Sequence, residues 1–194
     1  MNYPLKLSFR ILALTPQLSV TDVHGNLIFY VKQKLFKLKE SVTVFADEQQ
    51  VQPLYGIKAD RVLDFSARYY FTDQKGTELG SVERQGMKSL WKARYDILDG
   101  NRTIMAIREE NPWIKVLDGL FGEIPLIGMF SGYVFHPAFI VSRPQGMVVM
   151  RLKKQPSLFE NRFTIKRMTE LSQTEETQVL LSLLMMILLE RRRG

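Results

Sequence analysis

The chain ends in QVLLSLLMMILLERRRG, residues 178–194, and this stretch decides the fold. From Val179 to Leu189 every residue except Ser182 is apolar, and arginines fill positions 191–193. Ser172 and Glu175, just upstream, have the spacing of a capping box. Acidic residues at the start and basic residues at the end favour the helix dipole. We therefore predict a helix over residues 173–192, roughly 30 Å long at about 1.5 Å per residue.

This predicted helix has three possible surroundings: a membrane, a partner protein or the chain's own core. A membrane-spanning helix needs about 20 apolar residues, whereas the apolar run here covers eleven positions. A helix lying at a membrane surface needs a polar face, which the run lacks. A helix that is apolar on all sides must be buried on all sides. We therefore predict a core helix, with a membrane tail and a partner-docking helix as the alternatives.

The rest of the chain predicts short strands joined by turns. The segments TDVHG (21–25) and TDQKG (72–76) repeat, each with a valine six residues after its glycine, and SRPQG (142–146) is a looser third copy. In the first two copies aspartate can accept backbone N–H groups and glycine tolerates positive φ, so each copy predicts a β-hairpin. About a dozen such strands closed around the helix would form a can-shaped antiparallel barrel, an all-β fold.

The chain is expected to form one domain over residues 1–194, because no linker or low-complexity tract divides it.

The segment NPWIKVLDGL (111–120) begins with a good N-cap and a proline, and predicts a short helix near 112–118. At the N-terminus, alternating apolar and polar residues predict a half-buried strand rather than a signal peptide. The absence of cysteine excludes disulfides and thiolate sites and agrees with a cytoplasmic location.

Several features together resemble a known family. They are DVHGNLIFYVKQK (22–34), DQKGTELGSVERQGMKSLW (73–91) and the apolar helix at the end of the chain. The chain resembles the LURP-one-related proteins and, more distantly, the tubby C-terminal domain and the phospholipid scramblases. This resemblance implies an antiparallel barrel of about twelve strands threaded by its C-terminal helix.

The resemblance also implies a role in binding rather than in catalysis. Tubby-type domains bind phosphoinositides and tether to membranes, and the scramblases act on membranes. This chain has no cysteine to acylate and no calcium-loop spacing, so scramblase activity is not expected. No segment matches the phosphoinositide motif of the tubby domain, so none of its binding residues is assigned here.

No signature of an enzyme, a cofactor site or a metal site stands in the sequence. His24 and His136 have no second ligand at metal-binding spacing. Neither the nucleophile elbow of esterases nor the glycine patterns of nucleotide-binding loops occur. We therefore predict no catalytic, cofactor-binding or metal-binding residue, and a non-enzymatic protein.

Basic residues are the candidates for ligand binding. The chain has 27 basic and 20 acidic side chains, a net charge of +7. Such an excess attracts anionic lipid, nucleic acid or acidic proteins, although strand lysines also serve as solvated residues that discourage edge pairing. No nucleic-acid reader motif occurs, so that partner is not expected. The candidate anion- or lipid-binding residues are Lys32, Lys34, Arg143, Arg151, Lys153 and Lys154.

The segment LFGEIPLIGMFSGYVF (120–135) carries Glu123 as its only charge. It is either a buried loop and strand or an exposed apolar surface that contacts a partner.

The leading functional hypothesis is a binding or membrane-tethering module that recognises anionic phospholipid headgroups, cytoplasmic or peripheral at a membrane. The alternative is a protein-interaction scaffold that uses residues 120–135.

Overall fold

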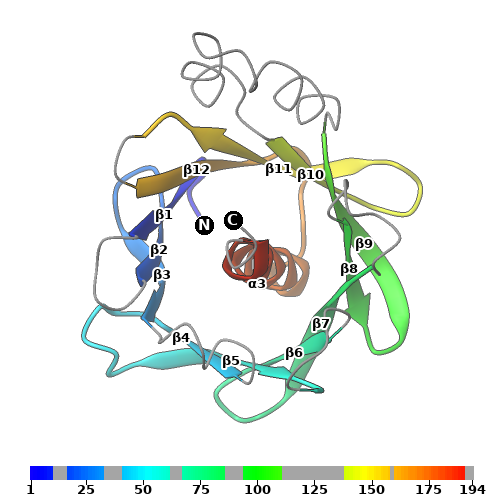
Figure 1. Ribbon diagram of the computed structural model, residues 1–194, viewed down its shortest axis with the longest axis horizontal. Coiled ribbons are helices and arrows are strands. Elements are labelled where there is room, and N and C mark those ends of the chain that lie inside the picture. Colours follow the sequence, from blue (N-terminus) through cyan, green and yellow to red (C-terminus); the bar gives the residue numbers. More distant parts are fainter. Residues whose placement is uncertain are drawn as a thin grey trace, which may run out of the picture.

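The computed structural model describes residues 1–10, 17–32, 41–61, 67–85, 94–110, 138–157 and 160–190, called the described residues below. They form an antiparallel barrel around one helix (Figure 1). The predicted helix near 112–118, the apolar segment 120–135, His136 and Lys34 lie outside them. The described strands are β1 (Leu5–Arg10), β2 (Gln17–Thr21), β3 (Leu27–Lys32), β4 (Ser41–Phe45), β5 (Pro53–Ala59), β6 (Arg68–Thr72), β7 (Glu78–Arg84), β8 (Arg94–Asp99), β9 (Arg102–Glu109), β10 (Ala138–Ser142), β11 (Val148–Gln155) and β12 (Glu160–Arg167).

Each strand pairs with the next one along the chain, and β1 pairs with β12 to close the barrel. The alternation along β1 explains how the wall is built: Leu5, Leu7 and Phe9 are buried, whereas Lys6 and Arg10 are exposed. Successive side chains of a strand point to opposite faces, so the apolar set faces the inside and the basic set faces solvent. The predicted all-β barrel of about a dozen strands is confirmed.

The three sequence repeats are the turns of the β2–β3, β6–β7 and β10–β11 hairpins. In the first, Asp22 Oδ1 accepts hydrogen bonds from the backbone N–H groups of His24 and Asn26, both at 2.9 Å. In the second, Asp73 Oδ1 accepts from Lys75 and Thr77, both at 2.8 Å. The glycine of each copy has positive φ, 86°, 81° and 90°. The predicted hairpins are therefore confirmed, and their shared chemistry explains the repeat.

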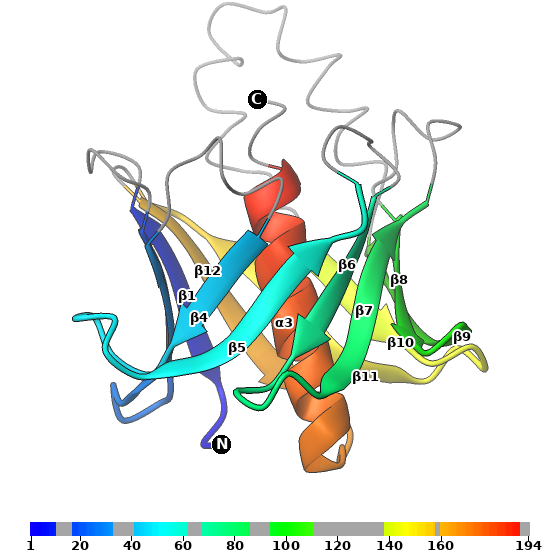
Figure 2. The ribbon, with the colours of Figure 1, turned by 90° about the horizontal axis from the view of Figure 1, so that it is seen from below.

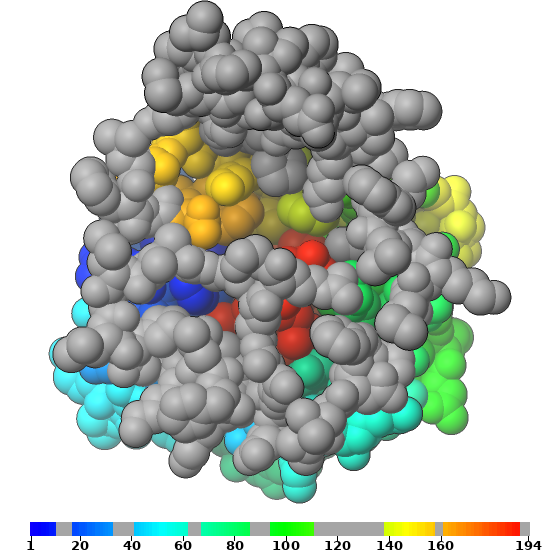
Figure 3. All heavy atoms as spheres, in the orientation of Figure 1, coloured from blue at the N-terminus to red at the C-terminus, as the bar shows by residue number. Residues whose placement is uncertain are grey.

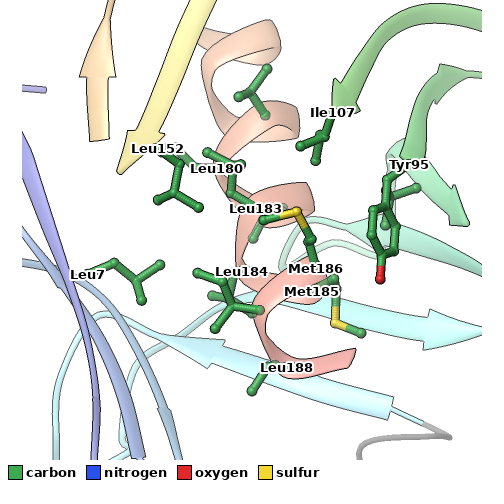
Figure 4. Packing of buried hydrophobic residues seen from close by; sticks show 14 of the residues in the cluster. Leu7, Tyr95, Ile107, Leu152, Leu180, Leu183, Leu184, Met185, Met186 and Leu188 are labelled. Carbon is green, nitrogen blue, oxygen red and sulfur yellow. The ribbon is translucent and has the colours of Figure 1, made fainter. Parts of the chain in front are cut away.

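The C-terminal helix α3 (Gln173–Glu190) runs lengthwise through the barrel (Figure 2). Its residues from Glu176 to Leu188 are all buried, which confirms the predicted core helix. Leu7, Ile107 and Leu152 point from the wall towards the helix leucines and methionines (Figure 4). Burying each such side chain contributes about 1.5–3 kcal/mol. In Figure 3, residues of α3 are seen within the ring of strands.

Polar contacts set the position of α3 inside the barrel, where it packs against β7 and β8. Gln178 Nε2 donates a 2.5 Å hydrogen bond to the carbonyl oxygen of Leu79, and Ser182 Oγ donates to the carbonyl oxygen of Gln178 at 2.7 Å. Buried polar groups are costly unless they are paired. These bonds therefore allow two polar residues to lie within an otherwise apolar core.

The start of α3 is capped by its own side chains, and its last residue is attached to the barrel wall. The capping box is confirmed: Ser172 Oγ accepts from the backbone N–H of Glu175 at 3.3 Å, and Glu175 Oε2 accepts from the backbone N–H of Ser172 at 3.1 Å. At the other end, the Tyr95 hydroxyl donates to Glu190 Oε1 at 2.6 Å, and Arg84 Nε lies 3.5 Å from the same oxygen. The capping box therefore stabilises the start of the helix, and the Glu190 contacts hold its end to β7 and β8.

Candidate anion-binding face

Strand pairing gathers basic side chains on one side of the barrel wall. β11, β12, β1, β2 and β3 are consecutive neighbours in the sheet, although β1 and β12 lie at opposite ends of the chain. We call the outer surface of these strands the basic face. Its cationic members among the described residues are Lys6, Arg10, Lys32, Arg151, Lys153, Arg162 and Lys166.

The densest part of the basic face surrounds Thr164 on β12. Thr164 is paired with Lys6 of β1 on one side and with Lys153 of β11 on the other. Side chains of directly opposite residues lie on the same face, with Cβ atoms about 4.5–5.5 Å apart. Lys166, the next outward residue of β12, is directly opposite Arg151. Cations therefore lie on three sides of one threonine.

The basic face continues along the strands. Arg162 is opposite Ser8, and Arg10 and Lys32 are both opposite Gln17, which lies between them on β2. Tyr30 lies at this end, where burial and the nearby Glu48 raise its pKa while Arg10 opposes that rise. Positive charge thus extends over several rows of the sheet, with Glu48 near its β3 edge.

The charges near Thr164 are poorly compensated. Like charges directly opposite on neighbouring strands destabilise a sheet, and one of the pair here is neutralised: Arg151 Nη2 lies 2.7 Å from Glu110 Oε2. Lys6, Lys153 and Lys166 are exposed, and within the described part of the chain no carboxylate lies within ion-pair distance of them. Three uncompensated ammonium groups therefore share a small area.

The opposite wall has a different charge pattern. On β8, Arg94 Nε lies 3.2 Å from Asp96 Oδ1. At the β8–β9 turn, Arg102 Nη2 lies 3.8 Å from Asp99 Oδ2. The exposed Arg102–Asp99 pair contributes little to stability, about 0–1 kcal/mol. Asp96 is buried, and both pairs neutralise the local field.

Exposed cations with no ion pair among the described residues also occur elsewhere, such as Lys58 on β5 and Arg108 on β9. What distinguishes the basic face is that three such lysines gather around one residue, Thr164.

The six candidate anion-binding residues that the sequence predicted do not all lie in one place. Arg151 and Lys153 lie together on the basic face, and Lys32 lies at its β3 edge. Lys154 is half-buried and is paired with Phe163, on the interior side of the wall. Arg143 belongs to a hairpin turn, where its Nη1 lies 2.8 Å from Glu175 Oε1.

The sequence-based prediction missed four members of the basic face, which are Lys6, Arg10, Arg162 and Lys166. Their alternation with apolar residues in LKLSFR and ENRFTIKR does indicate outward positions. The pairing of β1 with β12 was the missing information, because it joins segments at opposite ends of the chain.

A second charged cluster lies where α3 begins. The guanidinium of Arg167 lies 5.0 Å from the ring centre of Tyr3, and its Nη1 is 3.5 Å from Glu176 Oε1. Burial, and then the neighbouring Glu176, raise the pKa of the Tyr3 hydroxyl, which stays protonated. These contacts attach the first residues of the chain and the helix start to the wall, a structural role.

Neither metal-binding clusters nor membrane-spanning helices occur in the part of the chain that the structure describes. No three His, Asp or Glu side chains there gather closely enough to hold a metal ion. His24 lies in the β2–β3 hairpin turn. No helix among the same residues has both the length and the apolar character needed to cross a membrane.

The fold places this protein in the class of closed antiparallel barrels whose twelve strands enclose a C-terminal helix. The chain belongs to the LURP-one-related family, whose model matches residues 27–166. A crystal structure of a protein from Arabidopsis thaliana has a similar fold, with a TM-score of 0.51 and 17% sequence identity over 100% of this chain and 94% of that one. Among curated proteins, none matches at a significant level.

Proposed function

We propose that the chain is a non-enzymatic binding module, a single domain over residues 1–194, that tethers to anionic membrane surfaces through the basic face. The observation that carries the proposal is the uncompensated charge of Lys6, Lys153 and Lys166. Such a cluster disfavours the folded protein alone and becomes favourable beside an anionic partner. The protein would then be cytoplasmic and peripheral at the membrane.

The expected strength of this attraction follows from the number of cations. Each lysine or arginine close to an anionic bilayer contributes about 1 kcal/mol. Three lysines would therefore strengthen binding by about 3 kcal/mol, or roughly 100-fold in affinity. Because the attraction is electrostatic, it should weaken as added salt shortens the Debye length.

The scaffold hypothesis concerns residues 120–135, which lie outside the described residues, so it stays a prediction. The basic face is the preferred contact surface for this proposal, because three exposed lysines gather around Thr164 there.

Sedimentation with vesicles tests the proposal. Wild-type protein should sediment with phosphatidylcholine vesicles that contain phosphatidylserine and not with phosphatidylcholine alone. The double variant Lys6→Glu/Lys153→Glu should bind about 1,000-fold more weakly, because four units of charge are changed.

The matched control is Lys58→Glu/Lys75→Glu, which changes the net charge equally at two exposed lysines away from the basic face. It should retain most of the binding. Equal losses in the two double variants, or binding that ignores phosphatidylserine, would reject the basic face as the contact surface.

A further inference from the structure

We propose that Thr164, together with Lys6, Lys153 and Lys166, forms a discrete subsite for a phosphate monoester. This inference rests on the proposed function and specifies it. A general electrostatic attraction would accept any anionic bilayer, whereas this subsite would select a headgroup that ends in a terminal phosphate.

The geometry of the subsite follows from strand register. Lys6 and Lys153 flank Thr164 across the strands, with Cβ atoms about 4.5–5.5 Å from that of Thr164. Lys166 follows two residues further along β12, about 7 Å away at the rise of a strand. A flexible four-carbon stem lets each ammonium group lean over the central residue. Three cations can therefore converge above a single hydroxyl.

The hydroxyl adds a donor to these charges. Thr164 is half-buried, and its side chain makes no hydrogen bond to any other described residue. By contrast, the hydroxyls of Thr169 and Thr177 donate to backbone carbonyls at 3.1 and 2.9 Å. A hydroxyl both donates and accepts hydrogen bonds, so Thr164 can donate to an oxygen held between the lysines.

A phosphate monoester suits this arrangement better than other anionic groups. It carries a charge of about −1.5 to −2 at pH 7 and three strong acceptor oxygens. Three ammonium groups more than balance that charge, and together with the hydroxyl they supply a donor for each of the three acceptor oxygens. Arg151 borders the subsite but is held by Glu110 at 2.7 Å, which leaves recognition to the lysines and Thr164.

The test compares two vesicle types of equal measured surface charge, one containing phosphatidic acid and the other phosphatidylserine. Phosphatidic acid presents a phosphate monoester, whereas phosphatidylserine presents a phosphodiester and a carboxylate. Wild-type protein should bind phosphatidic acid more tightly. Thr164→Val removes the hydroxyl while keeping the side-chain shape, and should lower that preference about tenfold without changing phosphatidylserine binding.

The control variant is Thr43→Val, which makes the same change at an exposed position of β4. It should keep the wild-type preference. Circular dichroism of both variants checks folding, and valine suits a strand.

A soluble competitor distinguishes two sources of the phosphate. If glycerol 3-phosphate displaces the protein from phosphatidic acid vesicles, the subsite accepts free phosphate monoesters as well. If it does not, while the preference and its loss in Thr164→Val persist, the subsite needs the headgroup in a bilayer.

Two negative results have different meanings. Equal wild-type binding to both vesicle types would overturn the subsite and leave the proposed membrane tethering intact. No binding to either vesicle type would overturn both.

Discussion

Gly80 lies on the wall strand β7, where the side chain of Gln178 from the core helix comes close to the backbone. Its φ is +132°, and an added Cβ would lie 2.7 Å from the carbonyl oxygen of Leu98 and 2.8 Å from Gln178 Nε2. Gln178 in turn donates to the neighbouring Leu79 carbonyl. Glycine is therefore needed here both for its backbone conformation and for the space that the Gln178 side chain occupies.

We predict that Gly80→Ala destabilises the protein by about 3 kcal/mol, since backbone strain and a clash with backbone atoms add together. Gly76→Ala is the matched control, because Gly76 also has positive φ but no atom within 4 Å of an added Cβ. It should cost only about 1 kcal/mol. Urea unfolding followed by circular dichroism measures both, and equal losses would show that the approach of Gln178 imposes no added cost.

At the scale of elements, the third hairpin differs from the other two for a reason found in the helix. Where the first two turns have Asp22 and Asp73, the third has Arg143. Its guanidinium lies 2.8 Å from Glu175 in the first turn of α3. The departure from the repeat thus attaches the helix start to the β10–β11 hairpin.

This attachment predicts a dependence of stability on pH. The hydrogen bond from Arg143 is the largest cause that lowers the pKa of Glu175. A carboxyl whose pKa is lowered on folding contributes its full stability above its unfolded pKa, about 4.3, and loses it as the pH falls through the folded value. The pair should therefore stabilise the protein at neutral pH and not in acid.

Arg143→Gln should cost about 0.5–1 kcal/mol at pH 7, a value suited to a partly exposed pair. The difference from wild type should disappear once acid protonates Glu175. The free energy of unfolding in urea, measured at pH 7 and at several values below the ordinary glutamate pKa, checks this. Asp22 and Asp73 also have lowered pKa values. Their contributions to the free energy of unfolding are the same in wild type and variant, so they cancel in the difference. A difference that stayed constant down to acid pH would contradict the assignment.

For the whole molecule, the barrel and its helix form one core. Leu184 is fully buried in α3 and belongs to one apolar cluster with residues from strands spread over the chain, including Leu7 and Leu152 (Figure 4). Neither the strands nor the helix could bury their apolar faces without the other. Folding should therefore require the helix within the barrel.

Leu184→Ala should destabilise the protein by about 2–5 kcal/mol, because it leaves a cavity in the core. Leu184→Asp, which buries an unpaired charge, should prevent folding, as should truncation before Val179. Met147→Ala is the control, because Met147 is 54% exposed and its loss should have little effect. Thermal unfolding followed by circular dichroism tests these expectations. A soluble, cooperatively folded truncation would contradict the role of the helix.

Local sequence patterns determined most of the architecture. The apolar run from Val179 to Leu189 required a buried helix, because no face of it could meet water. Alternation in β1 and the Asp-x-x-Gly turns determined strands and hairpins, because period-two burial and positive φ are properties of neighbouring residues. The capping box at Ser172 belongs to the same group.

Only the tertiary structure decided where the charges gather. Lys6 and Lys153 are far apart in the sequence, and they flank Thr164 because β1 closes the barrel against β12. The pairing of β11 with β12 sets Lys154 opposite Phe163 on the interior side, and Glu175 at the helix start forms an ion pair with Arg143. Strand register across a closed barrel depends on packing of the whole core, so no local pattern specifies which cations become neighbours.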